Sequence, residues 1–95
     1  MKVNYPLLAA EKERDALRFI VDYIAREDYP PKLREIGDAM RPPWSKSKCS
    51  DVHRRLAAKG YLQLGSEARA IKVLQGVELL DHEIRILERN VEAPA

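Results

Sequence analysis

The chain has 95 residues, of which 45% are hydrophobic and 34% are charged, as is typical of one globular domain. The net charge of +2 identifies no partner, and no apolar run approaches the roughly 20 residues of a membrane span. The N-terminus has no signal-peptide apolar segment, and the single cysteine, Cys49, excludes an internal disulfide, so we expect a protein of the reducing cytoplasm without membrane contact.

The first predicted element is a helix over about residues 9–27. Its apolar residues recur at the i, i+3, i+4, i+7 spacing of one helix face: Leu17, Ile20, Val21 and Ile24. Pro30 and Pro31 end it, because proline disfavours helix in the residue before it. A short second helix is predicted over about residues 32–40, with an apolar stripe of Leu33, Ile36 and Met40.

The next break, residues 41–45, contains two prolines that cannot continue the helix. Ser45 is a suitable N-cap for a third helix over about residues 46–59, and Gly60 is a natural residue to end it. The inward positions of this helix are Cys49, Val52 and Leu56. Trp44 either fills the gap between the two helices or lies on a sugar-phosphate backbone, and we favour the packing role.

The hydrophobic period then changes from 3.6 to 2. This change predicts two strands, residues 61–64 and 70–74, joined as a hairpin by a loop over residues 65–69. The rest of the chain returns to helical spacing and predicts a helix over about residues 77–92, with an apolar stripe of Val77, Leu80, Ile84, Leu87 and Val91.

A helix-turn-helix followed directly by a hairpin is the element order of a winged helix-turn-helix. We therefore predict a mainly α fold with a β-hairpin, in which residues 1–75 form this unit and residues 76–95 form a C-terminal helical tail. Residues 32–74 carry a net charge of +6, between acidic ends of −1 and −3. A basic centre is typical of proteins that bind a polyanion, although a solvated surface of mixed charge has the same composition.

Four segments carry a family resemblance: residues 19–24 (FIVDYI), 29–40 (YPPKLREIGDAM), 56–62 (LAAKGYL) and 69–74 (RAIKVL). In order and spacing they resemble the DNA-binding domain of the LexA repressor family, over about residues 7–74. The chain departs from the family at Lys32, where a threonine or serine is usual, and at residues 41–43, where a glycine is usual. The resemblance implies DNA binding but not self-cleavage, because 95 residues leave no room for the family's serine peptidase domain.

The outward side of the third predicted helix is the candidate for reading DNA bases. Ser47, Ser50, Asp51 and Arg54 recur at i, i+3, i+4, i+7, opposite the inward positions. Arg54 can pair with O6 and N7 of guanine, and Asp51 can accept a hydrogen bond from N4 of cytosine. The alternative is a solvated helix face on which Asp51 pairs with Arg54 or Arg55. Arg55 is also a candidate DNA contact.

Phosphate contacts are expected from the start of the third helix and from the wing. Ser45, Lys46 and Lys48 lie at the helix N-terminus, where backbone amides and cations suit a phosphate. Ser66 and Arg69 lie on the wing, where an arginine either enters a narrow minor groove or remains a solvated cation at a strand end.

We expect no catalytic or metal site. Cys49 and His53 have the i, i+4 spacing of two metal ligands on one helix, but two ligands are too few, and we expect Cys49 in the core. The sequence has no glycine-rich phosphate loop, and no carboxylate pair stands out, so neither enzymatic activity, a cofactor nor a small-molecule substrate is predicted.

The apolar stripe of the tail helix requires a surface to pack on, because a helix of this length is marginal alone. Acidic flanking residues, Asp81, Glu83 and Glu88, would repel one another in a self-paired coiled coil, parallel or antiparallel. We therefore predict that the stripe packs on a first helix, of its own chain or of a dimer mate. We favour the homodimer, because one helix-turn-helix reads only a half-site.

Together these features predict a sequence-specific protein that binds double-stranded DNA and regulates transcription. The alternative is a winged-helix module that binds another protein and has no role on DNA. The basic centre and the serine- and lysine-rich third helix favour DNA.

Overall fold

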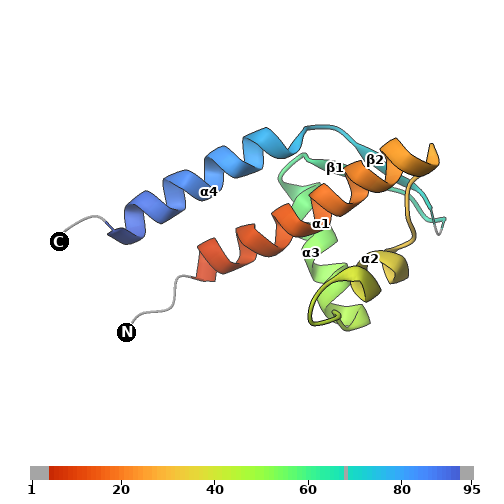
Figure 1. Ribbon diagram of the computed structural model, residues 1–95, viewed down its shortest axis with the longest axis horizontal. Helices are drawn as coiled ribbons and strands as arrows, with labels where there is room; N and C mark the ends of the chain where they lie inside the picture. Colours follow the sequence, from red (N-terminus) through yellow and green to blue (C-terminus); the bar gives the residue numbers. More distant parts are fainter. Residues whose placement is uncertain (1–4, 68, 93–95) are drawn as a thin grey trace.

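The computed structural model describes residues 5–67 and 69–92, and it confirms the predicted order of elements (Figure 1). A two-stranded antiparallel hairpin stands between the third and fourth helices of this part of the chain. The elements are α1 (Tyr5–Glu27), α2 (Leu33–Ala39), α3 (Lys46–Ala58), β1 (Leu62–Leu64), β2 (Ile71–Val73) and α4 (Val77–Glu92). The fold is therefore a winged helix-turn-helix with an additional C-terminal helix.

Helix α1 begins four residues before the predicted start. Its first turn contains Pro6, which is compatible with a helix there because the first backbone N–H groups have no partner within the helix. Two leucines and two alanines then continue it, and both residue types favour helix. The helix ends at Glu27, and Asp28 follows it with a left-handed φ of +66° and an N–H that donates to the Ile24 carbonyl at 2.9 Å.

Helices α2 and α3 approach closely at a glycine. Gly37 is buried, and a Cβ atom at this position would lie 3.3 Å from the Trp44 carbonyl oxygen. The Gly37 carbonyl accepts the Trp44 N–H at 3.0 Å, which fixes the end of the turn between the helices. The absence of a side chain at Gly37 thus lets the turn fold back against α2.

The C-terminus of α3 leads directly into the hairpin. Gly60 has a φ of +84°, its N–H donates to the Ala57 carbonyl, and the Tyr61 N–H donates to the Leu56 carbonyl at 2.9 Å. This is a Schellman motif, and it confirms Gly60 as the residue that ends the helix. Leu62 of β1 pairs with Val73 of β2, so the hairpin continues from the end of α3.

Helix α4 runs antiparallel alongside α1, so that the start of α1 and the end of α4 lie at the same end of the molecule (Figure 1). Leu80 and Ile84 are 0% and 3% exposed and belong to the same core as Leu17 of α1. Val77 and Leu87 pack against this core, and the side chain of Val91 lies outside the described residues.

The stripe of α4 therefore packs on α1 of its own chain. Of the two predicted partners of Val77, Leu80, Ile84 and Leu87, the structure shows the first helix of the same chain, and their assignment to a dimer interface stays a prediction that this packing counts against. The core is also continuous across residue 75, where we expected the tail to begin. Among the described helices, none is both long enough and apolar enough to span a membrane.

Candidate nucleic-acid interface

The outward side of α3 is polar, whereas its inward side lies in the core. Cys49, Val52 and Leu56 are at most 3% exposed, as the helical spacing predicts. On the opposite side the exposed residues are Ser47, Asp51 and Arg54, with Ser50 half-buried beside them. The structure therefore confirms the rotation of α3 from which the candidate base contacts were chosen.

Asp51 and Arg54 form an ion pair on this outward side. Arg54 Nη2 lies 3.0 Å from Asp51 Oδ1, and the two side chains are 74% and 59% exposed. Exposed ion pairs contribute little to stability, because water solvates both charges well. Both side chains can therefore exchange this contact for another polar partner at little cost.

The first turn of α3 carries two lysines. Ser45 is the N-cap, and its Oγ accepts the Lys48 N–H at 3.2 Å. Lys46 is exposed, while Lys48 Nζ lies 5.6 Å from the centre of the Trp44 ring. The Trp44 ring packs against the core, which confirms the packing role.

A groove between α1 and α3 brings a further cation to this surface. Leu8 and Lys12 of α1 line it together with Ser47, Lys48 and Asp51 of α3. Sequence reasoning missed Lys12, because its place on the first helix, 35 residues before Ser47, gives no sign of a role beside α3. The helix-turn-helix surface thus includes part of α1.

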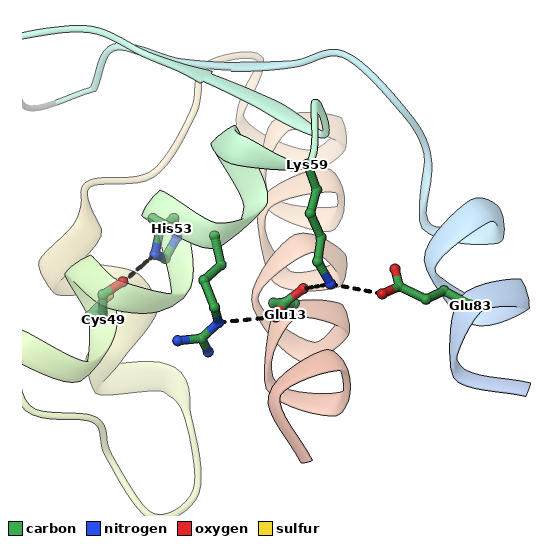
Figure 2. A network of polar contacts seen from close by, with 6 residues as sticks. Glu13, Cys49, His53, Lys59 and Glu83 are labelled. Atoms are coloured by element: carbon green, nitrogen blue, oxygen red, sulfur yellow. Dashed lines mark hydrogen bonds and ion pairs between the residues drawn. The ribbon is translucent and has the colours of Figure 1, made fainter. Parts of the chain in front are cut away.

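Arg55 is turned away from the outward side of α3 and joins an ionic cluster around the buried Glu13, defined here as Glu13, Arg55, Lys59 and Glu83 (Figure 2). Glu13 of α1 is 0% exposed, and its two oxygens lie 3.1 Å from Arg55 Nε and 2.7 Å from Lys59 Nζ. Lys59 Nζ also contacts Glu83 of α4 at 2.8 Å. Figure 2 shows Lys59 between the two carboxylates.

The electrostatics of this cluster favour the charged form of Lys59. Partial burial disfavours the Lys59 ammonium, but the hydrogen bonds to Glu13 and Glu83 outweigh that effect and raise the pKa of Lys59. Sequence reasoning missed Glu13, although it interrupts an apolar stripe at helical spacing: Ala10, Glu13, Leu17 and Ile20.

Arg69 does not project from the wing. Its Nη1 lies 3.0 Å from Glu35 Oε1 and donates to the Pro30 carbonyl at 2.9 Å, and its guanidinium stands 4.7 Å from the centre of the Tyr29 ring. The wing arginine therefore ties the hairpin to the α1–α2 connection. Its insertion in a minor groove stays a prediction, and this placement counts against it.

The remaining polar residues of the hairpin face solvent. Ser66 is exposed in the loop, as expected for a candidate backbone contact. Lys72 is exposed on β2, opposite Gln63 of β1. Ser66 and Lys72 therefore form a small polar surface on the wing that does not include Arg69.

Cys49 and His53 lie in the core rather than in a metal site. His53 Nδ1 is 2.7 Å from the Cys49 carbonyl oxygen and therefore donates to it (Figure 2), while His53 is 0% exposed. Burial lowers the pKa of His53 and raises the pKa of Cys49. The described residues contain no group of three potential metal ligands.

Comparison with known proteins points to one family. Residues 8–70 match the family model of the LexA DNA binding domain. A LexA repressor of Lactiplantibacillus plantarum is 38% identical over 86 residues, covering 80% of this chain and 39% of the repressor. One of Leuconostoc mesenteroides is 40% identical over 76 residues, covering 73% and 34%, and one of Bacillus licheniformis is 36% identical over 86 residues, covering 86% and 38%.

The chain thus spans little more than a third of the length of these curated relatives. No solved structure gives a significant match.

Proposed function

This chain belongs to the family of LexA DNA-binding domains, and from that premise we propose that it binds double-stranded DNA and represses transcription. Helix α3 enters the major groove, and the β1–β2 hairpin lies on the backbone or in the minor groove. A single unpaired cysteine favours a reducing compartment, so we propose that the protein binds DNA in the cytoplasm.

One observation carries the proposal: α3 is fixed by its apolar side and presents a polar side that nothing else in the described chain covers. The core holds Val52 and Leu56, so the side chains of Ser47 and Arg54 must point outward. A helix in the second position of a helix-turn-helix, with such a face, has the shape and chemistry to read base edges.

Base reading is assigned to the outward side of α3. Arg54 releases Asp51 and pairs with O6 and N7 of a guanine, while Asp51 accepts from N4 of a cytosine. Ser47 and Ser50 supply short hydroxyls that both donate and accept hydrogen bonds, and they let the helix approach the bases closely.

Phosphate binding is assigned to the residues that surround this face. Ser45, Lys46 and Lys48 serve at the start of α3, where the helix dipole also favours an anion. Lys12 extends the contact to α1, and Ser66 extends it to the wing. The paired states of Arg55 and Arg69 make them weaker candidates for phosphate contacts than these residues.

Two copies are proposed to bind adjacent half-sites, because one helix-turn-helix covers only part of an operator. The packing of the apolar stripe of α4 on α1 favours contacts other than this stripe between the two copies. Sedimentation of the protein with a duplex that holds two half-sites one helical turn apart is expected to give two copies per duplex. One copy at saturation would reject this part of the proposal.

A fluorescence anisotropy titration with an arbitrary duplex at low salt tests DNA binding itself. If about six cations neutralise phosphates, the logarithm of the association constant should fall against the logarithm of the salt concentration with a slope of about −5. A module that binds only proteins would give no saturable change in anisotropy, and a slope near zero would remove the phosphate contacts.

A further inference from the structure

Two cations of α3 converge on one buried carboxylate of α1. Arg55 and Lys59 lie four residues apart, on the same side of the helix, and contact the two oxygens of Glu13 at 3.1 and 2.7 Å. The Glu13 side chain is only 1% exposed, whereas Arg55 is 41% and Lys59 36% exposed. Glu13 therefore has its two polar partners on α3 and is otherwise surrounded by protein.

This geometry controls the rotation of α3 about its own axis. Successive residues of an α-helix are about 100° apart, so a rotation of that size would exchange Arg54 for Arg55 on the outward side. The burial of Val52 and Leu56 already excludes a rotation of that size, and the ion pairs of Arg55 and Lys59 with Glu13 add a directional restraint on smaller rotations. The apolar contacts of Val52 and Leu56 are less directional and would tolerate small rotations more readily.

Helix α4 reinforces the same arrangement through Lys59. Lys59 caps the C-terminus of α3 and contacts Glu83 of α4 at 2.8 Å (Figure 2). The ion pairs thus connect α1, α3 and α4 at one point. The end of α3 is held from two sides, while its start remains at the candidate DNA surface.

We propose that Glu13 is a positioning residue for DNA recognition: it fixes the rotation of α3 and withholds Arg55 from the DNA phosphates. The proposal rests on the proposed function. Arg55 lines the same groove as Lys12 and Lys48, while its charge is balanced by Glu13. Glu13 thereby improves discrimination between sequences and limits non-specific attraction.

The variant Glu13→Gln tests this role in the full chain, since glutamine keeps the size of glutamate but removes its charge. Arg55 is then released toward DNA. We expect a several-fold gain in affinity for an arbitrary duplex at low salt and a salt slope steeper by about 0.9. The ratio of affinities for a selected and a scrambled duplex should fall several-fold. A residue needed only for stability would weaken binding to both duplexes, and that outcome would overturn the proposal.

Glu88→Gln is the matched control. It removes the same unit charge from an exposed position on α4, and it is expected to keep the wild-type salt slope and affinity ratio. If Glu88→Gln gives the same gain as Glu13→Gln, the effect is one of net charge, and the positioning role is rejected.

Arg55→Met provides a second test that keeps the Glu13 carboxylate and its contact with Lys59. The salt slope should remain that of the wild type, because Arg55 makes no phosphate contact while Glu13 holds it. In Glu13→Gln/Arg55→Met, the added slope of Glu13→Gln should vanish and the lower affinity ratio should persist. A slope shallower by about 0.9 in Arg55→Met alone would show that Arg55 binds phosphate in the wild type and would overturn the proposal.

Thermal melts followed by circular dichroism establish which variants are folded at the temperature of the titrations. If Glu13→Gln is unfolded, the salt slope of Arg55→Met alone decides whether Arg55 binds phosphate in the wild type. A different result would show that the proposed function is wrong: the wild type itself would show no salt-dependent binding to DNA. A wild type that binds, with a Glu13→Gln variant indistinguishable from it, would refute the positioning role alone.

Discussion

Arg54 and Asp51 lie one turn apart on α3, and their ion pair is open to solvent. Arg54 is therefore the side chain of this face best able to pair with a base, since it reaches furthest and gives up little on leaving Asp51. Lys46, at the start of the same helix, has a flexible point charge suited to phosphate. We therefore expect Arg54 to control discrimination between sequences and Lys46 to control the affinity for any duplex.

Arg54→Ala should reduce the affinity for a selected duplex by about 1–3 kcal/mol and reduce the affinity for a scrambled duplex much less. Lys46→Ala should weaken both about equally and make the salt slope shallower by about 1. Anisotropy titrations of each variant with both duplexes provide the comparison. Equal losses for Arg54→Ala on the two duplexes would assign Arg54 to the phosphates.

His53 makes the stability of the fold dependent on pH. Burial lowers its pKa, the hydrogen bond to the Cys49 carbonyl opposes that shift, and Nε2 has no partner among the described residues. Because the unfolded chain takes up a proton near pH 6.5 and the folded chain at lower pH, the free energy of unfolding should decrease as the pH falls below about 6.5.

Urea unfolding at pH 7.5 and 5.5 measures this effect. His53→Leu should remove up to about 1 kcal/mol of the difference between the two pH values. His82→Gln is the matched control, because His82 is exposed on α4, and it should keep the wild-type difference. An unchanged difference in His53→Leu would contradict a buried, neutral His53.

At the scale of elements, α4 contributes to stability because it covers the apolar side of α1. Leu80 of α4 is 0% exposed, whereas the adjacent Leu79 is 52% exposed. Substitutions of the two leucines therefore test the buried and the exposed side of the same helix. Helix α4 lies within the fold in the described chain, so its removal is expected to affect stability before it affects association.

Leu80→Ala should lower the free energy of unfolding by about 2–5 kcal/mol, because it leaves a cavity between α1 and α4. Leu79→Ala should change it by no more than about 0.5 kcal/mol. Urea titrations of the full chain give both values, and sedimentation of the same samples gives their mass. A similar small effect for both leucines would mean that α4 does not dock on α1 in solution.

At the scale of the whole molecule, the sequence predicts the fold because local and global signals agree. The helical spacing of Val52 and Leu56 identifies the inward side of α3, and Gly60 marks its end. The change to a period of 2 after Gly60 locates the hairpin. These signals depend on neighbours in the chain, so they can be found without knowledge of the tertiary structure.

Contacts between distant residues are what the sequence does not reveal. Arg55 meets Glu13, and Arg69 meets Glu35, across more than 30 residues of chain in each case. Nothing in the spacing of the charges distinguishes these pairs from the free cations of a DNA surface. The choice between an intramolecular and an intermolecular contact for α4 is of the same kind, because its stripe is apolar in either case.

The outward side of α3 is proposed to read base sequence. The most direct test of this proposal is to select bound sequences from a pool of random duplexes and to measure the affinity ratio of the selected duplex to a scrambled one at physiological salt. We expect a ratio of about 1,000 or more. A ratio near one would contradict the proposal, because the protein would then bind phosphates without reading bases.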